Sequence, residues 1–251
     1  MILSELKKLI WSITHWIIAL IVIATFFFIT GPKTIHFKGR ELLVPSIQDR
    51  TFTVEVLSKM QSDLIPQNVD LIVTSPLDAF LVEIQISLFL SFCLCLPIFL
   101  YGVLRYVHPA LKEHERGGLY KIIVPSVVLF IGGCLFAYLL LLPATIKILY
   151  SYTTHINVVP FFLLFDFISL VLTLMFVTGC MFLMPVLMAL LSRFGFIKFG
   201  FWKKHWRYII FAFVIATAII TPDGTGITMA MLAIPLCLLY ILGMLLSARD
   251  S

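Results

Sequence analysis

The chain has 251 residues, of which 61% are hydrophobic and only 12% are charged, with a net charge of +5. Soluble domains carry about 25% charged and about 45–50% apolar residues, so the 23 Phe residues exceed what one water-soluble core of this length can hide. This composition excludes a soluble enzyme, a disordered region and a disulfide-stapled secreted module, and it indicates a polytopic membrane protein.

The first apolar run covers residues 9–29 and follows Lys7 and Lys8. Its 21 residues exceed the roughly 7–15 residues of a signal-peptide core. No A-x-A cleavage pattern follows the run. At about 1.5 Å per residue the run covers the roughly 30 Å hydrocarbon core, so we expect a retained transmembrane helix.

Residues 30–78 form one long polar stretch, which we expect to be an outer loop. Within this loop, residues 52–57 partly alternate between apolar and polar types. The pattern is compatible with either a short strand or an interfacial helix.

Five further apolar runs predict five more spans, at 79–104, 122–142, 166–191, 208–220 and 227–247. The expected fold class is therefore all-α, a polytopic integral membrane protein with six transmembrane helices. Residues 1–251 form a single membrane domain in this interpretation. No internal repeat is evident, so periodicity gives no support to an inverted-repeat transporter.

The basic residues are distributed unevenly between the two sides of the predicted bundle. With a cytoplasmic N-terminus, 12 of the 18 basic residues fall in inner segments. Nine of them lie in two inner loops of 17 and 16 residues, whereas the 49-residue outer loop holds five. Because short positively charged loops stay in the cytoplasm, the sequence predicts an N-in, C-in topology in the plasma membrane.

The fifth predicted span is short, because about 13 apolar residues give only roughly 20 Å of helix. Such a helix must thin the bilayer, draw flanking residues inward or bury its ends in protein. Pro185 and Pro235 fall inside the fourth and sixth spans, where a proline removes a backbone hydrogen bond and tends to kink the helix. We therefore expect a curved, concave bundle with a short fifth helix.

The five cysteines lie within apolar runs and form no C-x-x-C pair, and the six histidines show no ligand spacing. We interpret the cysteines as small buried hydrophobes, and we expect no metal site and no cofactor. The positive net charge fits the membrane topology, so it does not indicate nucleic-acid binding.

The densest polar patch is the predicted inner loop after the second span, which includes Tyr106, Pro109, Glu115 and Arg116. A metalloprotease site is excluded, because His114-Glu115 is followed by Gly118 where the H-E-x-x-H motif needs a second His. Two interpretations remain. The loop is solvated and structural, or Glu115 accepts a bidentate guanidinium from a cationic partner.

Glu5 is a second carboxylate on the predicted cytoplasmic side, at the start of the first span. In the first turn of a helix a carboxylate favours the helix dipole, so a structural role is sufficient. The alternative is that Glu5 and Glu115 together bind two positive charges.

Besides the six acids of the outer loop, three further acids lie on the predicted outer side. Asp166 opens the fourth span and Asp223 precedes the sixth, and helix capping accounts for both. Glu83 lies about one turn inside the second span, where a carboxylate is costly unless it reaches water or a partner. A role in partner contact or lipid perturbation is the alternative for Glu83.

Several short motifs follow one another along nearly the whole chain. They are Ser75-Pro76, Leu96-Pro97 with Leu100-Tyr101, Tyr106-x-x-Pro109-Ala110-Leu111-x-x-x-Glu115-Arg116, Phe182-x-x-Pro185-Val186, Thr221-Pro222-Asp223 and Ala233-Ile234-Pro235. In these motifs the chain resembles TatC, the multispanning receptor of the twin-arginine protein translocase. Six spans with both ends inside, a long first outer loop and a short fifth helix also fit that family.

The resemblance implies a non-enzymatic receptor in an oligomeric complex. It would bind signal peptides with consecutive arginines and recruit TatA-type, or also TatB-type, single-span partners. Folded proteins would then cross the bilayer, driven by the protonmotive force. No Walker-type glycine-rich loop occurs in the sequence, in keeping with that energy source.

The resemblance also implies residue roles. Glu115 would pair with a signal-peptide arginine and Glu5 would be the second acidic contributor, while Tyr106 stands where the family often has Phe. Pro109 and Arg116 belong to the same signal-peptide-binding motif. The remaining matched or nearby positions are expected to be partner contacts or structural, namely Pro76, Glu83, Pro185 and Asp223.

Three positions depart from the family pattern. Leu183 stands where many relatives carry an intramembrane Glu or Gln, Ile241 replaces a common Glu, and Lys7 replaces a frequent Arg. The first departure argues against any mechanism that needs a carboxylate inside the fourth span.

Two other functional classes remain as alternatives. A small-solute secondary transporter would need charged or polar groups near mid-bilayer, where these spans offer almost only Ser, Thr and Cys. An intramembrane enzyme would need a nucleophile–base pair or a metal cluster at membrane depth, and no convincing set occurs.

Overall fold

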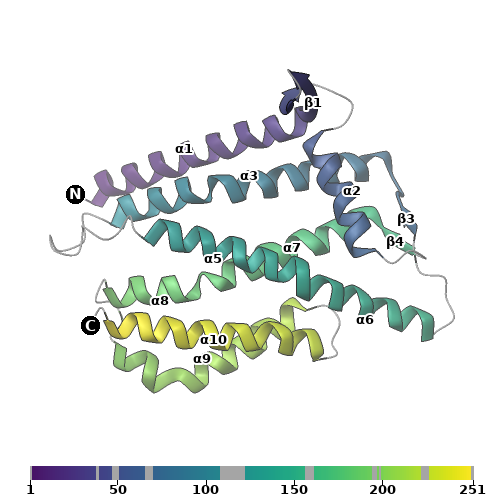
Figure 1. Cartoon of the computed structure of the whole chain (residues 1–251). Coiled ribbons are helices and arrows are strands. Elements are labelled where there is room, and N and C mark those ends of the chain that lie inside the picture. The colour runs from purple at the N-terminus through teal and green to yellow at the C-terminus, as the bar shows by residue number, and fades with distance from the viewer. Residues whose placement is uncertain are drawn as a thin grey trace. The chain divides into compact units, whose positions relative to one another are not determined.

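The computed structural model describes residues 2–37, 40–46, 51–65, 70–107, 122–155, 161–193, 197, 199–221 and 226–249 (Figure 1). The chain divides into two compact units. Unit 1 comprises Met1–Val103 with Pro160–Leu172, and unit 2 comprises Leu104–Val159 with Thr173–Ser251.

Unit 1 contains the segment that was predicted as one long outer loop. Its elements are α1 (Ile2–Ile29), β1 (Gly31–Phe37), β2 (Arg40–Ser46), α2 (Phe52–Leu64), β3 (Asp70–Ile72), most of α3 (Pro76–Val107), β4 (Phe161–Leu163) and the start of α7 (Leu164–Phe182). Strands β1 and β2 form an antiparallel hairpin from Gly31↔Ser46 to Phe37↔Arg40, whereas β3 and β4 pair in parallel. The helical interpretation of residues 52–57 is confirmed, and the two small sheets add strands to an otherwise helical chain.

Helices α1 and α3 lie side by side and antiparallel in unit 1 (Figure 1). Aromatic contacts fix this register, because the Phe28 and Phe80 ring centroids are 5.7 Å apart and those of Trp16 and Phe99 are 4.9 Å apart. The N-terminal turns of α1 therefore point toward the Val103 end of this unit.

All the described elements of unit 2 are helices. Its elements are the end of α3, α5 (Ile123–Phe136), the π-helical segment η3 (Ala137–Leu141), α6 (Leu142–His155), the end of α7, α8 (Met184–Arg193), α9 (Phe199–Ile220) and α10 (Ile227–Arg249). Buried apolar side chains such as Phe130, Met188 and Tyr240 form its core.

Four helical stretches are long and apolar enough to cross a bilayer, at Pro76–Leu104, Ile123–Tyr152, Leu164–Arg193 and Ile227–Ser247. They agree with the second, third, fourth and sixth predicted spans. A shorter apolar helix, Ile13–Ile29, falls within the first predicted span. The prediction of a helical, membrane-type protein is confirmed at this level.

Two helices extend beyond the apolar runs from which the spans were predicted. The helix of the third predicted span, 122–142, continues to His155. A wide π turn precedes Pro143, with the Leu142 N–H bonded to the Ala137 carbonyl. That shifted hydrogen-bond register accommodates a residue without an N–H donor. Helix α9 has 22 residues and begins nine residues before the fifth predicted span, whose apolar run starts at 208.

Proline affects the described spans unequally. Helices α3 and α10 continue through Pro97 and Pro235, whereas α7 ends at Phe182 and α8 begins at Met184. Leu183 stands at that break, directly before the turn that holds Pro185. Of the two spans in which a proline was expected to kink the helix, the fourth is broken next to Pro185 and the sixth is continuous through Pro235.

Candidate functional site

The predicted signal-peptide site lies mostly beyond the described part of the chain. Pro109, Glu115, Arg116 and Asp223 fall outside the described residues. Glu5 lies in the first turns of α1 and Tyr106 is the penultimate residue of α3, but their side chains are not among those described.

The backbones of α1 and α3 nevertheless show at which helix ends Glu5 and the start of the Glu115 motif lie. Because α1 runs antiparallel to α3, Glu5 is at the end of α1 that faces toward Val103 in unit 1. Helix α3 ends at Val107, and Glu115 follows it in the connection to α5. The sequence motif around Glu115 thus begins at the last turn of a long, apolar helix.

The indole nitrogen of Trp16 is a buried polar atom that no sequence motif indicated. Trp16 packs against Phe92 and Phe99, with ring centroids 6.1 and 4.9 Å away. Its indole Nε1 is buried and has no hydrogen-bond partner among the described residues. A buried indole N–H usually finds a partner, so this donor carries a desolvation cost in the α1–α3 interface.

Pro76 has a structural role at the start of α3. It is the first residue of the helix, a position that suits proline because its missing N–H would be unpaired there anyway. Ser75 and Asp78 cap the same turn, because the Ser75 N–H donates to the Asp78 Oδ2 at 3.0 Å and the Leu77 N–H donates to the Ser75 Oγ at 3.3 Å. The Ser75-Pro76 motif therefore sets where α3 begins.

Glu83 finds a partner inside unit 1. The Thr53 hydroxyl donates to Glu83 Oε2 at 3.5 Å, and Thr53 lies 2.6 Å from the Thr51 hydroxyl that caps α2. Thr53 is completely buried, while Glu83 is half-buried. The carboxylate is thus hydrogen-bonded to the start of α2. Finding a partner was one of the two ways, besides reaching water, in which Glu83 was expected to lower the cost of its burial.

A second polar link joins α3 to α7 within unit 1. The Gln85 side-chain amide donates to the Ser169 hydroxyl at 3.0 Å. Both residues lie in apolar helices, where an unpaired amide would be costly. This neutral pair holds two helices together and contains no carboxylate.

Pro185 is buried at a close contact between α8 and α10. A Cβ on Gly243 would lie 2.9 Å from the Pro185 Cα and 2.8 Å from the Met188 Sδ. Only glycine allows this approach, so Pro185 is a packing residue in unit 2. Leu183 is half-buried and Ile241 is exposed, so both departures from the family pattern place apolar side chains here.

A buried hydrogen-bond network joins α8, α9 and α10, and no sequence motif signalled it. The Trp202 Nε1 donates to the Ser192 Oγ at 3.0 Å, and the Ser192 and Ser247 hydroxyls are hydrogen-bonded to each other. The Tyr240 hydroxyl donates to the Trp202 carbonyl at 2.7 Å. The first turns of α9 are therefore fixed to both neighbouring helices.

Replacing Tyr240 by Phe is expected to lower the free energy of unfolding by about 1 kcal/mol, because it removes one buried hydrogen bond and retains the ring. Thermal unfolding in detergent micelles measures the effect. Tyr208→Phe is the matched control, since Tyr208 is 74% exposed. Equal stability of the two variants would contradict the role assigned to the network.

A family profile described as Sec-independent protein translocase protein (TatC) matches residues 2–235. The chain belongs to the TatC family. Among TatC relatives, that of Cenarchaeum symbiosum (strain A) is 32% identical over 195 residues, covering 78% of this chain and 74% of that protein. That of Aquifex aeolicus (strain VF5) is 35% identical over 193 residues, covering 75% and 78%.

Solved TatC structures have the same fold. A crystal structure of the twin arginine translocase receptor TatC matches with a TM-score of 0.75 at 28% identity, over 98% of this chain and 99% of that chain. A second TatC crystal structure, in DDM, gives a TM-score of 0.77 over 97% and 99%. The resemblance inferred from the motifs is confirmed, and this TatC-family protein is a multi-pass membrane protein.

Proposed function

We propose that this TatC-family protein is the receptor and core subunit of a twin-arginine protein translocase. The observation that carries the proposal is the family match through residues 2–235, which includes the loop with Glu115. In this proposal residues 1–251 act as one membrane domain with six spans and both termini in the cytoplasm.

Glu115 and Glu5 are the proposed acceptors for the paired arginines of a signal peptide. Arginine presents a planar fork that a carboxylate accepts through two parallel hydrogen bonds, which lysine cannot reproduce. The two inner loops and the N-terminal segment are otherwise rich in basic residues. Tyr106, Pro109 and Arg116 shape the same site, and the partners are TatA-type, or also TatB-type, single-span proteins in an oligomeric complex.

The protonmotive force is the proposed energy source, so export is expected to respond to a protonophore. Cells that lack their own TatC would express this chain with a TatA-type partner and a folded reporter carrying a twin-arginine signal peptide. A protonophore is expected to stop export of the reporter within minutes while cellular ATP is maintained by substrate-level phosphorylation. Fractionation of periplasm and cytoplasm measures export, and a reporter with two lysines in place of the arginines is the control. Unchanged export after collapse of the protonmotive force would contradict the proposal.

A further inference from the structure

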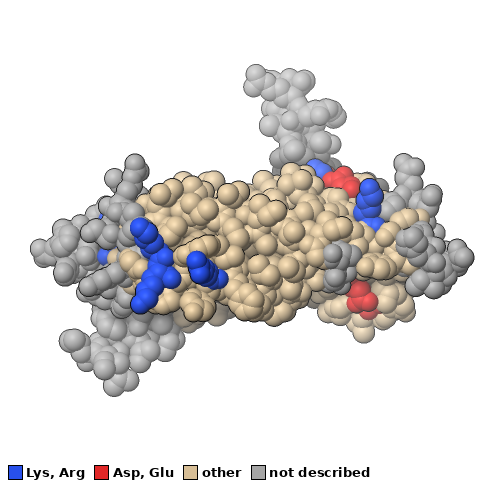
Figure 2. All heavy atoms as spheres, turned by 90° about the horizontal axis from the view of Figure 1, so that it is seen from below, with Lys and Arg blue, Asp and Glu red and all other residues tan. Residues whose placement is uncertain are grey.

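The first turns of α9 carry three exposed basic side chains within five positions. Lys203, Lys204 and Arg207 are all exposed, and together they are called the α9 basic surface. Described Lys and Arg side chains gather toward the left in Figure 2, at the end of unit 2 where α9 begins.

No carboxylate neutralises this surface among the described residues of its own bundle. The described parts of α8, α9 and α10 contain no Asp or Glu, and they add a further cation, Arg193, in the last turn of α8. Ser192, the residue before Arg193, is hydrogen-bonded to Trp202. The cations of α8 and α9 therefore lie at the same end of unit 2.

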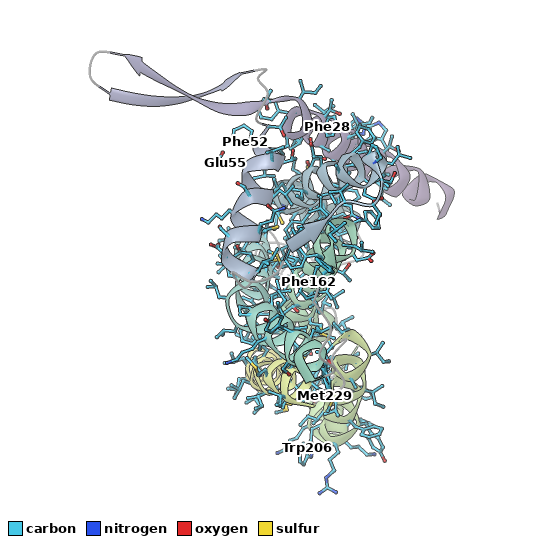
Figure 3. All side chains as sticks on the ribbon, turned by 90° about the vertical axis from the view of Figure 1, so that its right-hand side faces the viewer. Phe28, Phe52, Glu55, Phe162, Trp206 and Met229 are labelled. Carbon is cyan, nitrogen blue, oxygen red and sulfur yellow. The ribbon has the colours of Figure 1, made fainter. Side chains whose placement is uncertain are left out.

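Aromatic side chains flank the basic residues. Trp206 is 46% exposed and Tyr208 is 74% exposed, and Trp206 lies on the outer side of α9 (Figure 3). The Arg207 guanidinium carbon is 5.4 Å from the centre of the Trp206 ring. Phe201, His205 and Tyr208 form a row of rings with centroid distances of 4.2 and 6.2 Å. Exposed aromatic rings beside Lys and Arg are typical of the headgroup level of a bilayer.

The length of the apolar part of α9 sets the depth of this surface. From Tyr208 to Ile220 the helix is apolar, which gives roughly 20 Å against a hydrocarbon core of about 30 Å. Such a mismatch draws flanking residues toward the bilayer. The hydrogen bonds from Trp202 and Tyr240 hold the first turns of α9 against α8 and α10, so these turns are not free to swing into water.

We propose that the α9 basic surface binds the phosphate of an anionic phospholipid headgroup in the leaflet next to the start of α9. Lys and Arg supply charge-assisted hydrogen bonds to the phosphate, and the exposed rings lie along the upper part of the acyl chains. The proposal requires that α9 spans the membrane, but it does not depend on signal-peptide recognition or on which side the N-terminus lies.

Native mass spectrometry of lipid retention tests the site. The full chain would be taken from nanodiscs with equal amounts of phosphatidylglycerol and phosphatidylcholine, and the retained lipids would be counted. The wild-type protein is expected to retain phosphatidylglycerol preferentially. Replacing Lys203→Gln and Lys204→Gln together is expected to lower that preference roughly tenfold or more, because each cation near an anionic surface contributes several-fold to the binding constant.

The double variant Lys59→Gln with Lys147→Gln is the matched control, because it removes two exposed lysines that lie on α2 and α6. It is expected to retain the wild-type lipid preference. An equal preference in the α9 variant and the wild type would overturn the proposal, as would displacement of the lipid by millimolar inorganic phosphate, which would indicate a free-phosphate site. A twin-arginine peptide is expected to crosslink to the α9 variant as it does to the wild type. This crosslinking shows whether the proposed receptor function is intact, independently of the change in lipid preference.

Discussion

Replacing Glu115 by Ala is expected to abolish export of a folded twin-arginine reporter while the protein still accumulates in the membrane. A carboxylate paired with a guanidinium in a partly desolvated site contributes about 2–5 kcal/mol when one partner is removed, which corresponds to a loss of binding of roughly 30-fold to several thousand-fold. Glu5→Ala is expected to lower export as well, but by less than Glu115→Ala, because Glu5 is proposed as the second contributor.

The same loop offers a matched control for Glu115. Glu113 has the same charge two positions earlier, and Glu113→Ala is expected to leave export close to the wild-type rate. Export is measured as processed reporter in the periplasm, with membrane abundance measured in the same cells. Comparable export by the Glu113 and Glu115 variants would contradict the assignment of the arginine site to Glu115.

Replacing Gly133 by Leu is expected to prevent stable folding of unit 2. A Cβ at position 133 would lie 2.8 Å from the Gly179 Cα and 2.9 Å from the Thr178 carbonyl oxygen. Both of these are backbone atoms of α7, so they cannot move aside as a flexible side chain would. Overpacking a close contact costs about 1–3 kcal/mol and occasionally more. Because the new side chain on α5 would clash with the backbone of α7, we expect a loss of stability at or above the upper end of that range.

Gly132 provides the neighbouring control, since a Cβ there has no heavy atom within 4 Å. Gly132→Leu changes the same residue type in the same helix, so it accounts for the change in helix propensity. Thermal unfolding in detergent and abundance in the membrane are expected to be near wild-type for Gly132→Leu and strongly reduced for Gly133→Leu. Similar melting temperatures for the two variants would show that α5 and α7 do not approach closely at this point.

The described apolar helices could be predicted because length and composition alone identify a membrane span. The run at 227–247 lies within α10, Ile227–Arg249, since its beginning follows a turn sequence and its residues are almost all apolar. The extension of α6 to His155 was missed because Lys147 and the polar residues after it end the apolar run without ending the helix. The start of α9 was missed for the same reason, because its first turns hold Lys203 and Lys204.

Contacts between distant residues were beyond prediction from one sequence. Nothing in the local pattern indicates that Gly133 meets Gly179, or that Tyr240 donates to the Trp202 carbonyl. At the candidate site, the charge pattern indicated carboxylates on a basic side, Glu113 among them, and the family resemblance selected Glu115 and Glu5 and supplied their proposed roles. Pro76 and Glu83 were predicted as partner contacts or structural residues. Pro76 lies at the capped start of α3, and Glu83 accepts a hydrogen bond from Thr53.

Binding of twin-arginine and twin-lysine signal peptides to the wild-type protein and to Glu115→Gln tests the central claim most directly. The purified full chain would be titrated with each fluorescent peptide in detergent or nanodiscs. The wild type is expected to bind the arginine peptide at least about tenfold more tightly, because a bidentate charge-assisted pair contributes more than about 1.4 kcal/mol. Glu115→Gln is expected to lose most of this preference and to keep only the smaller part that Glu5 contributes. An undiminished preference for arginine in Glu115→Gln would contradict the account.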